Sequence, residues 1–161
     1  MEVKTAVVTG ANGFIGSHLC CKLVEEGFVV YGVYRNNFSH NPQFLKHVKS
    51  GKIVPCFGDV RSFDYEQLPK VDYIYHIAGK VSAYGKMDEF MDINYNGTER
   101  ILEYAKKITP KCFTYFSSTA VYGYDGYTNL KEGAQKKPFK NPYSISKLLT
   151  ENLVCDFCVK N

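Results

Sequence analysis

The sequence lacks any apolar run near the roughly 20 residues that a membrane-spanning helix requires, and its first residues do not form a basic region followed by a signal core. It also has little excess charge, with a formal net charge of +4. The densest basic stretch, residues 131–140, is interrupted by Gly133 and Pro138, which is typical of a solvated loop. We therefore expect a soluble, cytoplasmic protein with neither a membrane nor a nucleic-acid partner.

A metal site and a disulfide framework are also not indicated. The chain has six cysteines but no secretory signal, and the C-x-x-C pair at residues 155–158 is not followed by a second Cys or His pair at ligand spacing. We expect free thiols, with the C-x-x-C pair buried or half-buried on a helix. The cysteines are Cys20, Cys21, Cys56, Cys112, Cys155 and Cys158.

The composition is that of an ordinary folded domain. With 161 residues, of which 45% are hydrophobic and 22% charged, the chain is long enough to bury a core without staples. We find no internal repeat and no low-complexity linker. A single domain over residues 1–161 is predicted.

Short apolar runs alternate with segments of helical periodicity, which favours an α/β fold. Runs that are apolar on both faces indicate a parallel sheet covered on both sides, and right-handed crossovers make 3-2-1-4-5 the simplest strand order, that of a doubly wound Rossmann fold. The expected strands are residues 3–9, 28–34, 53–57, 71–78 and 112–118. The expected helices are residues 14–26, 42–50, 88–108 and 141 to near the end.

The first turn of this pattern, TGANGFIG at residues 9–16, has glycines at three-residue intervals between a strand and a helix. Gly10 permits a tight turn, Gly13 lets the backbone approach a pyrophosphate, and Gly16 lets the helix pack close to the strand. The helix N-terminus attracts the phosphate charge. The alternative is a plain strand-to-helix turn that happens to be rich in glycine.

A second motif pairs Tyr143 with Lys147, four residues apart on a predicted helix and therefore on one face. An ammonium beside a phenol favours the phenolate, which lets tyrosine act as an acid or base near neutral pH. Such pairs are common on protein surfaces. A functional role for this pair is supported by the segment FSSTAVYG at residues 116–123. That segment places hydroxyl groups at the carboxyl end of the fifth strand, where open α/β sheets bind ligands.

With these motifs the chain resembles the extended short-chain dehydrogenase/reductase family, in its epimerase/dehydratase branch. That branch includes nucleotide-sugar epimerases and dihydroflavonol reductase-like enzymes. The resemblance covers the whole chain, and each motif lies at an element boundary. Besides the motifs above, it rests on GDV at residues 58–60, HIAG at residues 76–79 and NYNGT at residues 94–98.

The resemblance implies a catalytic set. Ser118, three residues before Val121, would orient the substrate oxygen, and Tyr143 would exchange its proton. Lys147 would hold the nicotinamide ribose and lower the pKa of Tyr143. The neighbouring Ser117 and Thr119 are expected to bond the local backbone, although Thr119 could assist.

The resemblance also places Asp59 and Val60 at the adenine and Ala78 and Gly79 along the cofactor. Asn94 would fix the geometry of the long helix behind the site, with a helix-surface asparagine as the alternative. The full set of predicted cofactor-binding residues is Gly10, Asn12, Gly13, Phe14, Ile15, Gly16, Arg35, Asp59, Val60, Ala78, Gly79, Asn94, Tyr143 and Lys147.

The type of cofactor is a separate inference from the end of the second strand. NAD-preferring members usually carry an acidic residue there, whereas residues 33–36 read VYRN. Arg35 could pair with a 2′-phosphate, although it could also be a solvated side chain at a strand end. NADP is therefore the expected cofactor, with NAD as the alternative.

The leading functional hypothesis is an NADP(H)-dependent oxidoreductase that acts on a hydroxyl or carbonyl carbon of a small molecule. A nucleotide-sugar epimerase or dehydratase that retains its cofactor, and a non-catalytic dinucleotide-binding fragment or partner subunit, are the alternatives. Members of the family continue well past the Tyr/Lys helix. We therefore expect the domain to be incomplete, and the β-prone residues 111–117 to form an open edge that self-associates or pairs with a sheet-completing partner.

Overall fold

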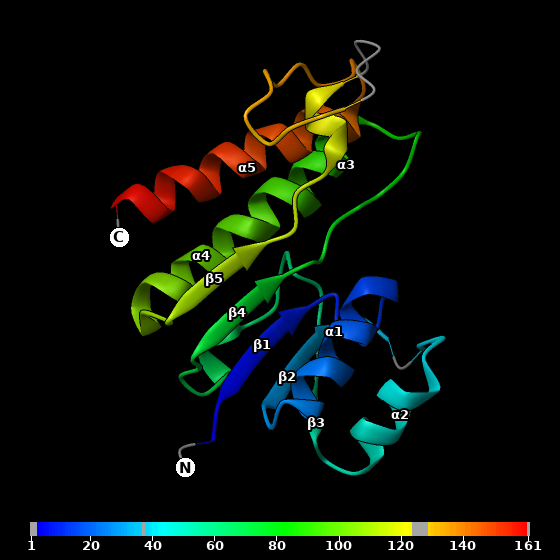
Figure 1. The fold of residues 1–161 in the computed structure, drawn as a ribbon, viewed down its shortest axis with the longest axis vertical. Helices are drawn as coiled ribbons and strands as arrows, with labels where there is room; N and C mark the ends of the chain where they lie inside the picture. The colour runs from blue at the N-terminus through cyan, green and yellow to red at the C-terminus, as the bar shows by residue number, and fades with distance from the viewer. Residues whose placement is uncertain (1–2, 37, 124–128, 161) are drawn as a thin grey trace.

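The computed structural model describes residues 3–36, 38–123 and 129–160. Its helices and strands alternate along the chain, as the sequence predicts (Figure 1). The strands are β1 (Thr5–Thr9), β2 (Val29–Tyr34), β3 (Ile53–Phe57), β4 (Tyr73–His76) and β5 (Cys112–Tyr115). The helices are α1 (Phe14–Glu25), α2 (Pro42–Lys49), α3 (Met87–Phe90), α4 (Gly97–Ile108) and α5 (Pro142–Lys160), with a π-helical turn at Met91–Asn96 and short 3₁₀ turns at Tyr65–Gln67 and Thr119–Tyr122.

The five strands form one parallel sheet in the order β3-β2-β1-β4-β5, so the predicted 3-2-1-4-5 topology is confirmed. Alternate residues of β1 point to opposite faces, because side chains alternate along a strand. Ala6 and Val8 join a core that includes Cys20 and Phe44. Val7 joins the other core, with Val33, Ile74, Ile101 and Tyr104 among its members.

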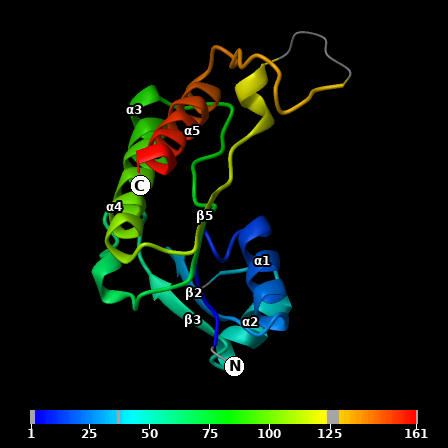
Figure 2. The ribbon, with the colours of Figure 1, turned by 60° about the vertical axis from the view of Figure 1, so that its left-hand side comes forward.

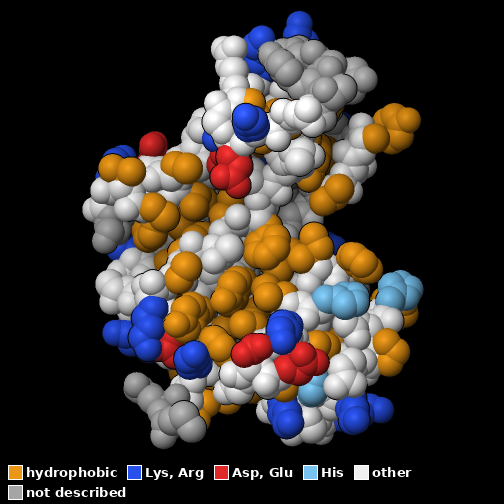
Figure 3. Space-filling model, in the orientation of Figure 1, with side chains coloured by type: hydrophobic (Ala, Val, Ile, Leu, Met, Phe, Trp, Pro, Cys, Tyr) orange, Lys and Arg blue, Asp and Glu red, His pale blue; other side chains and the backbone are white. Residues whose placement is uncertain are grey.

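The two cores correspond to two layers of helices. Helices α1 and α2 cover one face of the sheet, and α3, α4 and α5 lie on the other (Figure 2). The layer of α1 and α2 lies over β1, β2 and β3, whereas Tyr73 and Tyr75 on β4 remain half-buried and Cys112 on β5 is exposed. Hydrophobic side chains gather in the middle of the face shown in Figure 3.

The long helical segment differs in detail from its prediction. Residues 88–108 are helical, but Met91–Asn96 form a π-helical turn between α3 and α4. Such turns are rare and occur most often at functional sites. Here it is followed by Gly97, whose missing side chain leaves room for Val60: a Cβ at that position would lie 2.9 Å from Val60 Cγ2.

The described cysteines are all free. Cys155 and Cys158 lie on α5 as expected, but the expectation that they are buried or half-buried is wrong, because both are exposed. The pair falls near the C-terminal end of α5. In the described part of the chain, no helix is long and apolar enough to cross a membrane.

Candidate dinucleotide and catalytic site

The glycine-rich turn between β1 and α1 adopts the conformation that its glycines predict. Gly10 has φ +68°, and its N–H donates to the Val33 carbonyl at 2.9 Å. A Cβ on Gly16 would lie 2.1 Å from the Gly10 carbonyl oxygen, so only glycine fits there. The first turn of α1 carries no acidic side chain, and no side chain caps it. Its backbone N–H groups and the helix dipole are thus suited to a phosphate group.

Asn12 connects this turn to the segment after β2. Its side-chain Nδ2 donates to the Asn36 carbonyl at 2.9 Å and to the Phe38 carbonyl at 2.7 Å. The glycine turn and the end of β2 are therefore held together as one wall.

That wall belongs to a cleft of about 710 Å³ at the carboxyl ends of β1, β2, β3 and β4. The strand order reverses between β1 and β4, and open α/β sheets bind ligands at such a switch point. The predicted residues that line the cleft are Gly10, Asn12, Gly13, Phe14, Ile15, Gly16, Arg35, Asp59, Val60, Ala78 and Gly79. Those that do not line it are Asn94, Tyr143 and Lys147.

Other residues that line the cleft were not predicted from the sequence. Several of them lie next to a predicted residue at the carboxyl end of a strand, and that position in the sequence could have identified them. The additional described residues are Val33, Tyr34, Gly58, Ile77, Lys80, Val81 and Ile93.

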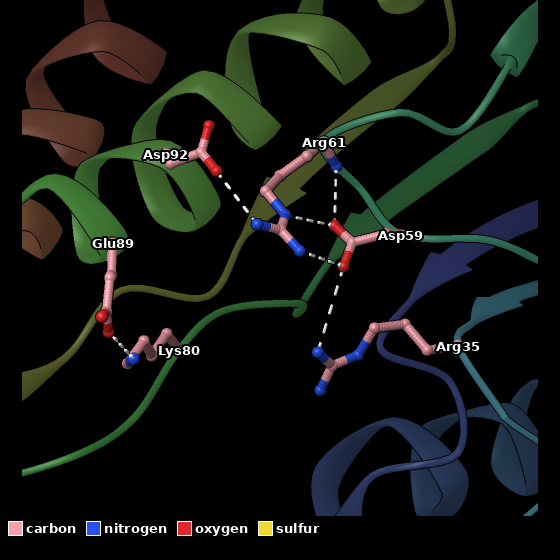
Figure 4. Close-up of polar contacts among 6 residues, drawn as sticks. All are labelled: Arg35, Asp59, Arg61, Lys80, Glu89 and Asp92. Atoms are coloured by element: carbon pink, nitrogen blue, oxygen red, sulfur yellow. Dashed lines mark hydrogen bonds and ion pairs between the residues drawn. The ribbon is translucent and has the colours of Figure 1, made fainter. Parts of the chain in front are cut away.

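A network of charges lies at the side of the cleft that Arg35 and Asp59 line (Figure 4). Asp59 accepts two hydrogen bonds from the Arg61 guanidinium, both at 2.9 Å, and Arg61 also reaches Asp92 at 3.1 Å. These bonds from Arg61 lower the pKa of Asp59 to about 2. Arg35 lies 3.9 Å from Asp59 and its side chain is 72% exposed. Among the described residues lining the cleft, Asp59 is the only carboxylate, and Arg61 already engages it.

Asn94, in the π-helical turn, is 2% exposed, so the alternative of a surface asparagine is wrong. Its Oδ1 accepts from the Lys80 backbone N–H at 2.6 Å, and its Nδ2 donates to Ser146 Oγ at 2.9 Å. Asn94 thus joins Lys80, in the wall of the cleft, to Ser146 on α5. Lys80 also pairs with Glu89 on α3.

His76, at the end of β4, is fully buried and was not predicted as a site residue. Thr9 Oγ1 accepts from the N–H groups of Ile77 and Ala78, both at 3.1 Å, so its own hydrogen must go to His76 Nδ1 at 2.7 Å. His76 Nε2 then carries the ring hydrogen and donates to Thr98 Oγ1 at 2.8 Å. A neutral histidine therefore anchors the backbone that forms one wall of the cleft.

The candidate catalytic residues come from α5 and from the segment that follows β5. Lys147 is 6% exposed, and its Nζ donates to the Phe116 carbonyl at 2.6 Å. Burial lowers the pKa of Lys147 to about 8. Tyr143, one turn earlier on α5, packs its ring against that of Phe90, with centroids 6.4 Å apart.

Ser118 lies two residues after Phe116. The hydrogen bond from Lys147 to the Phe116 carbonyl therefore ties Lys147 to the segment that carries Ser118. Ser118 Oγ accepts from the Ala120 N–H at 3.2 Å and caps the 3₁₀ turn, which leaves its hydroxyl hydrogen for another acceptor. Ser118 borders a second hollow, of about 610 Å³, beside α5. The expectation that Ser117 bonds the local backbone is wrong, because its hydroxyl donates to Glu151 on α5.

The chain matches the NAD dependent epimerase/dehydratase family over residues 6–161. It belongs to this family. The match confirms the predicted resemblance to the epimerase/dehydratase branch, together with the Rossmann-type fold.

Individual relatives agree with this assignment. The chain is 30% identical to human UDP-glucose 4-epimerase over 96% of its own length and 49% of the relative's. It is 26% identical to 2-alkyl-3-oxoalkanoate reductase of Shewanella oneidensis, with 96% and 39% covered. Among solved structures it is similar to UDP-glucose 4-epimerase from Bifidobacterium longum in complex with NAD⁺ and UDP, with a TM-score of 0.82, 29% identity, and 98% and 50% covered. The chain thus spans between 39% and 50% of the length of these relatives.

Proposed function

We propose that this chain is the dinucleotide-binding part of an NAD(P)-dependent oxidoreductase-type enzyme, and that the enzyme is a nucleotide-sugar epimerase. The observation that carries the proposal is the cleft at the switch point of the sheet, lined by the glycine turn, Asp59 and the backbone after β4. The UDP-sugar epimerases among the relatives support the substrate class.

The residues fit a dinucleotide. The glycine turn leaves no Cβ where a pyrophosphate would lie against the N-terminus of α1, and the cleft has the volume of a cofactor site. Gly10 to Gly16 would hold the phosphates, and Asp59 and Val60 the adenine. The bound nicotinamide would supply and accept the hydride.

The chain's own residues would handle the proton. Tyr143, as a phenolate, would take the proton from a substrate hydroxyl and return it when the carbonyl is reduced. The Lys147 ammonium would stabilise the phenolate and hold the nicotinamide ribose. Ser118 would donate its free hydroxyl hydrogen to the substrate oxygen, which fixes the reacting carbon toward the nicotinamide.

The cofactor proposal is NADP(H), although relatives hold NAD in their crystal structures. The last residue of β2 is Tyr34, a tyrosine that has no carboxylate to offer a ribose and that packs against the rings of Phe44 and Phe57. Arg35, which follows, presents an exposed guanidinium at the cleft. This feature also favours a second candidate function, net reduction of a carbonyl by NADPH.

The test combines binding and turnover. We expect dinucleotide binding by the 161-residue chain in a calorimetric titration. Isomerisation of a UDP-sugar without net change of cofactor supports the epimerase, and steady oxidation of NADPH with an added carbonyl supports the reductase. Binding with neither activity supports a non-catalytic subunit. Both assays should include the longer product if the reading frame continues beyond residue 161.

The catalytic assignment is tested in whichever form turns over. Tyr143→Phe should lower kcat by about 10² to 10⁴ and leave the dissociation constant of the dinucleotide nearly unchanged, because only the exchangeable proton is lost. Near-normal turnover of this variant would mean that another residue is the acid.

A further inference from the structure

Glu151 is a charged residue of α5 to which the proposed mechanism gives no role. It lies four residues after Lys147, which itself lies four residues after Tyr143, so the three share one face of the helix. Both of its carboxylate oxygens are engaged: Ser117 Oγ donates to one, and the Lys136 ammonium pairs with the other.

Lys147 has a different kind of environment. Its Nζ donates to the Phe116 carbonyl and lies 4.2 Å from the centroid of the Tyr115 ring. Within the described residues, no carboxylate lies within ion-pair distance of this ammonium. A buried ammonium held only by a carbonyl and a ring face remains available to a further partner, such as a ribose hydroxyl or a phenolate.

Two residues of α5 therefore form hydrogen bonds with two consecutive residues of the segment that follows β5. Lys147 holds Phe116 and Glu151 holds Ser117, and the next residue is Ser118. Because Ser117 and Lys136 engage both oxygens of Glu151, that carboxylate is satisfied without Lys147.

We propose that Glu151 is a positioning residue of the candidate catalytic site, and that Lys136 keeps its carboxylate from pairing with the Lys147 ammonium. This cluster of Ser117, Lys136 and Glu151 keeps Ser118 in register with Tyr143 and leaves Lys147 free for the cofactor. Its catalytic value depends on the proposed function, but the arrangement itself can be measured without turnover.

The groups around Lys147 set the direction of its titration. Burial lowers its pKa, and the Glu151 charge on the same helix raises it. His76 on β4 is neutral, and the Tyr115 ring on β5 carries no charge of its own. Lys136, from the segment before α5, acts on Lys147 mainly through the carboxylate that it neutralises.

The experiment is an NMR titration of the lysine side chains in the 161-residue chain, with the Lys147 signal assigned from Lys147→Arg. Lys136→Met should raise the pKa of Lys147 by roughly 0.5 to 1 pH unit, because the freed carboxylate turns toward it. Lys136→Arg should restore the original value. Lys131→Met removes an exposed lysine from the same segment and should change nothing.

A double-mutant cycle separates this coupling from a direct effect of charge. In the Glu151→Gln background, Lys136→Met should no longer raise the pKa of Lys147. An equal rise in both backgrounds, or the same rise in Lys131→Met, would overturn the proposal. A dinucleotide titration of the unmodified chain is read separately: absence of binding would defeat the proposed function, while the cycle would still decide the role of Glu151.

Discussion

At the scale of single residues, the buried side chain of His76 is held in place by hydrogen bonds at both of its ring nitrogens. His76 has no contact with solvent, and its two ring nitrogens are satisfied by Thr9 and Thr98 in a single tautomer. Burial lowers its pKa to about 3. A second proton on the ring would leave Thr9 with more donors than it can accept, because its oxygen already receives two backbone N–H groups.

This environment predicts a pH dependence of stability. The unfolded chain protonates His76 below about pH 6.5 and the folded chain does not, so the unfolded state binds more protons and stability falls as pH falls. Between pH 6.5 and pH 3, His76 should lower the free energy of unfolding by up to about 1.4 kcal/mol for each unit by which the pH falls. Urea unfolding at several pH values should show a shallower acid slope in His76→Gln. Equal slopes would mean that His76 titrates in the folded state.

Arg35 carries the second prediction at this scale. The chain should bind NADP(H) more tightly than NAD(H), and Arg35→Ala should erode that preference, because a charge-assisted contact contributes roughly 1.5 to 3 kcal/mol, or about ten- to a hundredfold. Lys49→Ala, which removes an exposed cation on α2 outside the cleft, is the control. Equal dissociation constants for the two cofactors in titration calorimetry would refute the prediction.

At the scale of elements, most of the fold could be predicted from the chain. The third strand has the predicted bounds, and the other elements differ by a few residues at their ends. The π-helical turn could not be predicted, because hydrophobic periodicity does not distinguish it from an α-helix over six residues. The contacts around it are tertiary: Asn94 within the turn and Gly97 after it contact Ser146 and Val60, which are far away in the sequence.

The same limit applies to the site. Much of the lining of the cleft could be predicted, because many of its residues lie at or just after the carboxyl end of a strand, and parallel strands end at one edge. The role of Ser117 could not, because its partner Glu151 lies 34 residues further along the chain. The ion pairs of Lys80 and Lys136 likewise depend on packing that no local pattern encodes.

The turn between β1 and α1 gives the prediction at this scale. Gly16→Ala would place a Cβ 2.1 Å from a backbone oxygen, so the turn must shift. We expect a loss of stability of about 1 to 3 kcal/mol and a marked loss of dinucleotide affinity. Gly133→Ala is the matched control, since its Cβ would meet nothing within 4 Å. Chemical denaturation and dinucleotide titration of both variants would test the two expected losses. An unchanged dinucleotide affinity in Gly16→Ala would mean that the turn does not bind the cofactor.

At the scale of the whole molecule, the two ends of the sheet are covered differently. Near β1 and β2 the sheet is packed on both faces, whereas near β4 and β5 the face on the side of α1 leaves Tyr73 and Tyr75 half-buried. Strand β5 pairs with β4, and no other described strand pairs with it. Matching relatives are about twice as long as this chain, which makes the region around β5 the place to test for a missing neighbour.

The last prediction concerns this open edge. A β-prone, aromatic strand with few charges invites pairing with another chain, so the isolated 161-residue chain should self-associate, bind dinucleotide weakly and show little turnover. Light scattering should be done under reducing conditions, because the exposed thiols of Cys112, Cys155 and Cys158 could otherwise cross-link. Cys112→Lys, which adds a charge to β5, should shift the chain toward monomer, whereas Cys158→Lys near the end of α5 should not. A monodisperse monomer with robust turnover would show that the edge needs no partner.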